Sequence, residues 1–199
     1  MKKMMFNERY GMESGVITGS KTMTRRDAEK VRLTYEVYRS IGEILSFNGV
    51  KERLEQFALR KSPFKVGDVV AVAQSYHALN KSGFLAPEWL DHTCESSAGY
   101  ENKMFVRADL MPHRIKITGV RFEQLQCISD EECLREGIYR RDDVIDSQMR
   151  PWVAYQYKGT SSLFRSPRDA FASLIDKVSG KGTWERNPYV YVYSFTLIA

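Results

Sequence analysis

The chain has 199 residues, 43% of them apolar and 28% charged, and this balance is typical of a soluble globular protein with one domain. Its net charge of +5 arises from 30 basic and 25 acidic residues, so it permits a polyanionic partner without requiring one. No apolar run approaches the roughly 20 residues of a membrane span. The N-terminal MKKMMFNERY lacks the apolar stretch of a signal peptide, and we therefore expect a cytoplasmic protein.

The cysteines and histidines lack the spacing of a metal site. Cys94, Cys127 and Cys133 form no CxxC pair, and His92 beside Cys94 offers only two candidate ligands, whereas zinc needs three or four. We expect no metal, and reduced thiols at 127 and 133 in or near the core. A Gly-rich phosphate loop is also absent from the sequence, and we expect no cofactor.

In the first third of the chain, helices are predicted on either side of a basic segment. ERYGMESGVITG predicts a short helix that ends at Gly19, a residue type that tolerates the left-handed conformation. From Asp27 to about Arg60 the sequence predicts helix again, interrupted at Gly49. The first of these later helices repeats an apolar residue every four positions, at Leu33, Val37, Ile41 and Leu45.

The middle of the chain predicts strands. Pro63 ends the helical segment, and a turn at Gly67 and Asp68 leads into an apolar strand, Val69 to Ala73. Residues 77–103 are rich in turn-forming residues and predict a long loop. KMFVRA predicts a short strand, and HRIKITGVRF predicts a longer, half-buried one because its apolar residues alternate with polar ones.

The last third predicts two helices and a final strand. ISDEECLREG carries a capping box, Ser129 with Glu132, and a terminal Gly137. Residues 139–165 predict an irregular insertion. SPRDAFASLIDKVSG predicts a helix from Ser166 to Gly180, and NPYVYVYSFTLI predicts a strand buried on both faces. The expected core side of that helix is formed by Phe171, Leu174, Ile175 and Val178.

Strands that do not alternate regularly with helices favour an α+β fold, built on a small curled sheet or β-barrel with flanking helices. We expect one domain over residues 1–199, with insertions at about 27–62, 77–103 and 139–165.

The stretch TGSKTMTRR concentrates cations and hydroxyls. A lysine such as Lys21 can activate a hydroxyl such as that of Thr24 if burial or nearby cations lower the pKa of the lysine. Arg25 and Arg26 are such cations, and they could also bind a phosphate or carboxylate. A solvated basic turn is the alternative interpretation.

Glu136 lies in the last turn of a predicted helix, where the helix dipole disfavours a carboxylate. An acid in such a position suggests a second role, either bonding a substrate or pairing with Lys21. Trp184 is interpreted as a core aromatic or as a stacking platform for a base. Asn187 is a turn residue or a ligand contact, and Tyr76 is a packed tyrosine or a pocket wall.

Three stretches together resemble the ASCH domain of the PUA-like superfamily: TGSKTMTRR, ISDEECLREGI and GKGTWERNPYVYVYSFTLI, with FKVGDVVAV between the first two. The shared features are G-x-K-T-x-T-R after a helix, G-D before a strand, E-G at the end of a helix and W-x-x-N-P before the last strand. The chain is most similar to longer, phage-like or bacterial members with insertions.

The resemblance implies a PUA-like β-barrel with a cleft lined by K-T-x-T-R and a nucleoside or RNA as partner. Some ASCH proteins are amidohydrolases that deacetylate N4-acetylcytidine. The resemblance implies that Lys21, Thr24 and Glu136 of this sequence match their catalytic residues. A non-catalytic RNA-binding module and a single-strand ribonuclease are the alternatives, and the oligomeric state stays open. The residues expected to contact substrate or RNA are Thr22, Arg25, Arg26, Tyr76, Trp184 and Asn187.

Overall fold

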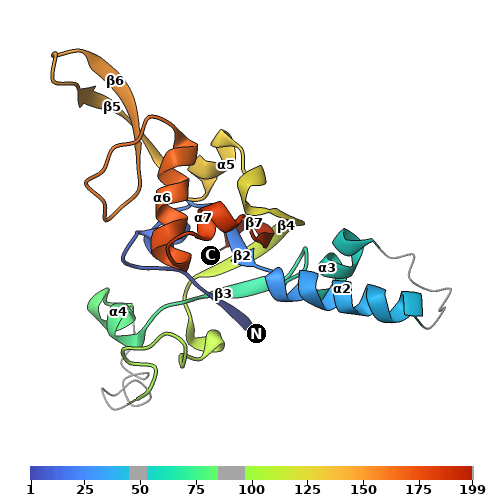
Figure 1. Ribbon diagram of the computed structural model, residues 1–199. Helices are drawn as coiled ribbons and strands as arrows, with labels where there is room; N and C mark the ends of the chain where they lie inside the picture. Colours follow the sequence, from blue (N-terminus) through green and yellow to red (C-terminus); the bar gives the residue numbers. More distant parts are fainter. Residues whose placement is uncertain (45–52, 85–96, 199) are drawn as a thin grey trace.

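The computed structural model describes residues 1–44, 53–84 and 97–198, and a five-stranded mixed sheet organises them (Figure 1). The strand order is β1-β3-β4-β7-β2, with β1 and β3 parallel and every other pair antiparallel. The bounds are β1 Lys2–Met5, β2 Met23–Asp27, β3 Val69–Ala73, β4 Arg114–Gln124 and β7 Tyr189–Ile198.

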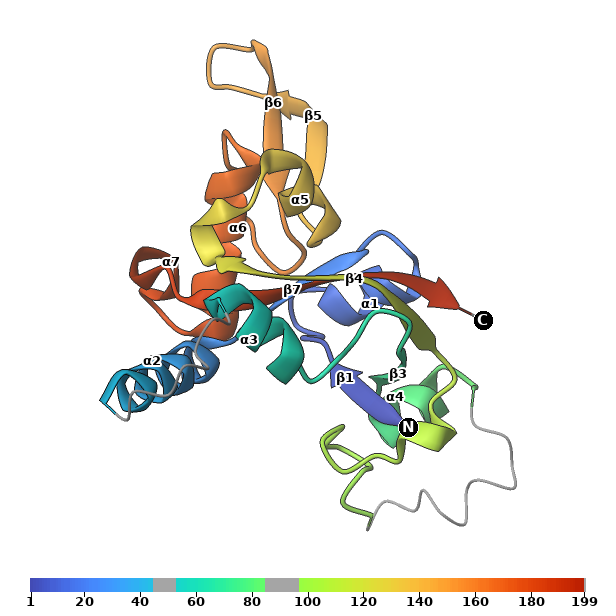
Figure 2. The same ribbon diagram turned by 90° about the vertical axis from the view of Figure 1, so that its right-hand side faces the viewer.

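Helices pack around this sheet, and a separate two-stranded hairpin extends from it. The α-helices are α1 Met12–Ile17, α2 Glu29–Ile44, α3 Leu54–Lys61, α4 Tyr76–Lys81, α5 Asp130–Arg135, α6 Pro167–Ser179 and α7 Thr183–Arg186. Within the described ranges, the 3-10 helix Ala108–Leu110 precedes β4, and the 3-10 helix Leu125–Cys127 lies between β4 and α5. The hairpin of β5 Tyr139–Ile145 and β6 Pro151–Gln156 projects away from the sheet in both views (Figures 1 and 2). Among the described residues, no helix has both the length and the apolar character needed to cross a bilayer.

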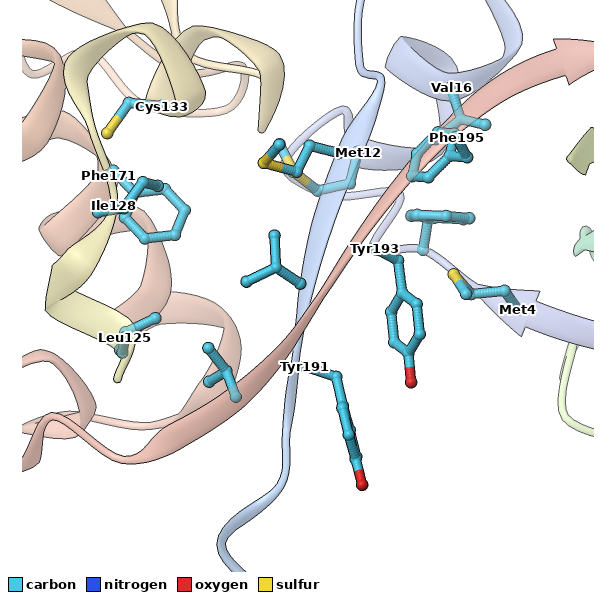
Figure 3. Close-up of a cluster of buried hydrophobic side chains, with 14 of the residues drawn as sticks. Met4, Met12, Val16, Leu125, Ile128, Cys133, Phe171, Tyr191, Tyr193 and Phe195 are labelled. Atoms are coloured by element: carbon cyan, nitrogen blue, oxygen red, sulfur yellow. The ribbon is translucent and has the colours of Figure 1, made fainter. Parts of the chain in front are cut away.

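Strand β7 lies at the centre of the main core. It pairs with β4 along one edge and with β2 along the other, and its residues 190–193 are all buried. Figure 3 shows Tyr191, Tyr193 and Phe195 of this strand among side chains from the helices and β1. The expectation of a strand buried on both faces is therefore confirmed for this part of β7.

The α+β class is confirmed, while the expected closed barrel is not found. In the part of the chain that the structure describes, β1 and β2 are the edge strands and do not pair with each other. Their proximity is nevertheless visible in one side-chain contact, since Arg26 Nη2 on β2 donates to the carbonyl of Met5 on β1.

Two predictions about irregular regions were wrong. KMFVRA forms turns that lead into the first 3-10 helix, because Met104 and Phe105 are exposed and lack a neighbouring strand to cover them. Residues 139–165 contain the β5–β6 hairpin. The sequence of this hairpin lacks the usual alternation of polar and apolar residues. Arg140 and Arg141 instead form salt bridges with the acids two residues further along the same strand.

Smaller corrections concern exposure and missed elements. The sequence did not predict β1, α4 or α7, each of six residues or fewer. Cys133 is buried as expected, but Cys127 is exposed, since it lies on a one-turn helix at the surface. Val178 is also exposed, because it lies near the end of α6, where the helix extends past the core.

The apolar residues spaced four apart, on which the prediction of helix α2 was based, are exposed. Leu33, Val37 and Ile41 are 48%, 60% and 50% exposed, because α2 reaches out from the sheet and packs chiefly on α3 (Figure 2). Leu45, the next member of that row, lies outside the described residues, as do His92 and Cys94.

Helix α5 should depend on its capping box. Ser129 Oγ accepts from the backbone N–H of Glu132 at 3.2 Å, and Ser129→Ala should cost about 1 kcal/mol of stability. For a protein of this size, that loss corresponds to a melting temperature lower by roughly 2–4 °C. Calorimetry tests this by comparing the melting temperature of Ser129→Ala with that of Ser162→Ala, a control in an exposed loop. Equal melting temperatures for the two variants would contradict the prediction.

Candidate active site

The structure brings Lys21 and Glu136 together in the interior. Lys21 Nζ lies 2.6 Å from Glu136 Oε2 and donates a second hydrogen bond, of 2.7 Å, to the Glu136 backbone carbonyl. The two residues are only 2% and 4% exposed. An ion pair so completely removed from water is costly unless both groups are well bonded, and here the lysine binds two acceptors of one residue.

Local backbone geometry creates this contact. Helix α5 ends at Glu136, and Gly137 follows in the left-handed region, with φ of 105°. The positive φ favours glycine here, and a Cβ at this position would also lie in tight contact, 3.1 Å, with the methyl of Met12. Because the turn leaves the Glu136 carbonyl free at the helix end, a cation can bond to it there, where the helix dipole favours positive charge.

Strand β2 is fastened to the same helix. The Thr22 N–H donates to the Arg135 carbonyl at 3.0 Å, and Arg135 Nε donates to Thr22 Oγ1 at 3.1 Å. Thr22, expected as a substrate contact, thus joins β2 to α5 instead of lining the cavity described below. Its position fixes Lys21, the preceding residue, against Glu136.

Arg25 is occupied by carboxylates. Its Nη1 lies 3.2 Å from Glu136 Oε1, and its Nη2 lies 2.9 Å from Glu123 Oε1 and 2.7 Å from Glu132 Oε2. Both terminal nitrogens are therefore bound to protein acids. Glu136 is held by Lys21 through one carboxylate oxygen and by Arg25 through the other, which fixes its orientation.

Burial determines the protonation of Lys21. Removal from water lowers the pKa of this lysine from its ordinary 10.5, and the positive charges of Arg26 and Arg25 lower it further, while Glu136 opposes the shift. The neutral amine is consequently more accessible than in an exposed lysine. A neutral amine carries a lone pair and can accept a proton, as a general base must.

A cavity of about 260 Å³ opens beside this pair. Lys21, Thr24 and Glu136 line it together with Arg25 and Arg26, so five of the nine predicted site residues lie in one place. The opposite wall comes from the apolar side of α6. In the described part of the chain, the Thr24 hydroxyl makes no hydrogen bond to another residue, which leaves it free to meet a ligand. The remaining lining residues are Phe6, Asn7, Met12, Asp27, Phe171, Leu174, Ile175, Val178 and Ser179.

Three predicted site residues lie elsewhere, in structural positions. Tyr76 belongs to a second, smaller core, where its hydroxyl accepts from the Arg107 N–H at 3.0 Å. Trp184 packs edge-on against Phe171 of α6, and Arg168 covers its ring at 5.1 Å. Neither ring lines the cavity beside Lys21.

Asn187 ends α7 in the left-handed conformation, with φ of 47°, and its side-chain oxygen accepts from the Gln126 N–H at 2.8 Å. It lines a different surface cavity, together with Glu29 and Arg32. The sequence therefore identified Asn187 correctly as a turn residue, and the structure separates it from Lys21.

Sequence reasoning missed the acids that hold Arg25. Glu132 was identified only as the capping-box residue, yet the carboxylate oxygen that approaches the Ser129 N–H also binds Arg25. Glu123 comes from β4, and its pairing depends on how β4 lies beside β7, which no local pattern indicates. A signal existed only for Glu132, as an acid one helical turn before Glu136.

Metal and thiol chemistry find no support in the described residues. No group of three His, Cys, Asp or Glu side chains there is arranged to hold a metal ion. Burial raises the pKa of the Cys133 thiol to about 12, which keeps it protonated and unreactive at neutral pH. The polar lining of the cavity consists of Lys21, Thr24, Glu136 and the two arginines, with Asn7, Asp27 and Ser179.

The lowered pKa of Lys21 predicts a pH-dependent stability. Since the folded protein binds this proton more weakly than the unfolded chain, the wild type should gain stability relative to Lys21→Met as pH rises toward 10.5. The gain should not exceed about 1.4 kcal/mol per pH unit. Urea unfolding between pH 7 and 10 measures it. Lys30→Met on the exposed side of α2 is the control, and the same pH slope for both variants would contradict burial of the Lys21 charge.

Comparison with protein-family models, with curated proteins and with solved structures found no match to this chain. The candidate site therefore rests on its own geometry: a buried Lys21–Glu136 pair on the wall of a cavity that the Thr24 hydroxyl also lines.

Proposed function

We propose that this protein is an ASCH-like amidohydrolase that cleaves a small amide, with N4-acetylcytidine as the model substrate. The observation that supports this function is the buried contact of Lys21 Nζ with Glu136 at a cavity that Thr24 also lines. A base, a nucleophile and an acid that orients the base form the minimal set for acyl transfer without a metal.

The reaction proceeds through an acyl enzyme. Thr24 Oγ attacks the amide carbonyl carbon while neutral Lys21 Nζ accepts the hydroxyl proton. The C–N bond breaks, the acyl group remains on Thr24 as an ester, and the amine leaves with a proton returned by Lys21 or Glu136. Water then hydrolyses the ester, which releases the carboxylic acid and restores the Thr24 hydroxyl.

The size of the cavity favours a small substrate. Sites for drug-sized ligands occupy roughly 300–1,000 Å³, and the cavity beside Lys21 has about 260 Å³. A single nucleoside or a similar amide suits this volume better than a polymer. The apolar wall from α6 would contact the flat face of a base or an acyl group, and the polar wall would face the amide.

Burial also favours an enzyme over a non-catalytic RNA-binding module. Cations that contact phosphates along a strand must be exposed, whereas Lys21 and Arg25 are buried and bonded to protein acids. The aromatic expected to stack on a base, Trp184, is engaged with Phe171 and Arg168.

The proposal includes a PUA-like barrel and a cytoplasmic location. Support for the barrel comes from the edge strands, because the bond from Arg26 to the Met5 carbonyl brings β2 near β1. A sheet whose two edges approach one another is curled toward the closed form.

Hydrolysis of N4-acetylcytidine by the purified protein, followed chromatographically, tests the activity. Lys21→Ala, Thr24→Ala and Glu136→Ala should each lower kcat/KM by about 100-fold or more, since general-base and nucleophilic contributions are of at least this size. Thr18→Ala and Lys30→Ala replace the same residue types at exposed positions and should keep full activity.

Two outcomes would contradict the proposal. Turnover that survives in Lys21→Ala would remove the general base from the scheme. Absence of turnover in the wild type, combined with RNA binding that weakens steeply as salt rises, would favour the RNA-binding module instead.

The rate should also depend on pH through Lys21. Because the base acts as the neutral amine, kcat/KM should rise with pH and level off above the lowered pKa of Lys21, below 10.5. A profile measured from pH 5 to 10 shows this limb. A rate independent of pH over the whole range would contradict a lysine base.

A further inference from the structure

Arg26 differs from the other cations of the cavity in its partners. Lys21 is bonded to Glu136, and both terminal nitrogens of Arg25 are bonded to acids. Arg26 donates from Nη2 to the Met5 carbonyl, and its guanidinium carbon lies 5.3 Å from the centre of the Phe6 ring. Among the described residues it forms no salt bridge with a carboxylate.

Arg26 is half-buried, and part of its guanidinium is shielded from water. Its Nε atom is buried and has no hydrogen-bond partner in the described part of the chain, and the same holds for Nε of Arg25. Burial lowers the pKa of Arg26, and Glu136 opposes that shift only from beyond bonding distance. An arginine stays charged under all ordinary conditions, so Arg26 presents to the cavity a positive charge that no carboxylate of the described residues pairs, although Asp27 and Glu136 also line the cavity.

We infer that the cavity binds an anionic oxygen group, a phosphate or a carboxylate, through Arg26. Cations removed from water are normally paired, and Arg26 lines the cavity without a carboxylate partner among the described residues, so a ligand anion is the missing partner. Together with the proposed function, on which this last step rests, the substrate is a small amide that also carries a negative charge.

Binding of inorganic phosphate and of acetate, each titrated separately against chloride at equal ionic strength, tests the inference. The readout is the ¹H–¹⁵N resonance of Arg26 Nε–H, assigned by its loss in Arg26→Lys. Saturable movement of this resonance with phosphate alone, acetate alone or both supports the inference and shows which group the site accepts. No movement with either anion overturns it.

Substitution gives a second measurement. Arg26→Met should weaken binding of the preferred anion at least 10-fold in calorimetric titrations, and Arg26→Lys should retain part of it. Arg9→Met is the matched control, since the Arg9 guanidinium also lies over a ring, that of Tyr10 at 5.6 Å, but outside the cavity. Unchanged affinity in a folded Arg26→Met variant overturns the inference. If that variant does not fold, the resonance measurement on the wild type decides alone.

The measurements distinguish a failure of the anion-binding inference from a failure of the proposed amidohydrolase activity. Anion binding is measured without an amide, so it can succeed where hydrolysis is absent. Turnover of neutral N4-acetylcytidine without any anion binding would keep the amidohydrolase and overturn the anionic substrate.

Discussion

The buried ion pair between Lys21 and Glu136 is the interaction on which the arrangement of the site depends. It joins the segment that enters β2 to Glu136, the residue that caps the C-terminal end of α5, and these two parts lie far apart in the sequence. Because one lysine nitrogen bonds both the carboxylate and the backbone carbonyl of Glu136, the pair fixes the helix end as well as the side chain. Arg25 holds the opposite oxygen, so the carboxylate has little freedom to turn.

Stability and chemistry make opposite demands on this pair. A charged lysine is stabilised by Glu136, but a general base must be neutral, and burial near two arginines favours the neutral form. Glu123 and Glu132 pair with Arg25 and offset its charge, which would otherwise lower the pKa of Lys21 further. The network thus balances the charge of the interior, while burial keeps the pKa of Lys21 below its ordinary value.

Patterns with a local physical cause were predictable from the sequence. The capping box at Ser129, the helix from Ser166 to Gly180 and the strands at Val69 and Arg114 follow from side-chain periodicity and end signals, and all are present. Glu136 was identified because a carboxylate at a helix C-terminus is unfavourable without a partner. Features that depend on long-range pairing were not predictable, including the β1–β3 pair, the acids around Arg25 and the exposed apolar row of α2. Composition also could not show that Tyr76 and Trp184 pack into cores away from the cavity.

The pairing of β2 with β7 has a consequence for how the protein is made. Thr24 and Arg25 lie opposite Tyr193 and Val192. The backbone of this cavity wall is therefore paired with a strand that is translated long after it. Until β7 has been synthesised, β2 cannot form this pairing. Contacts this distant slow folding and expose strand edges to aggregation. The cavity wall should therefore gain its full backbone support only after β7 has been synthesised.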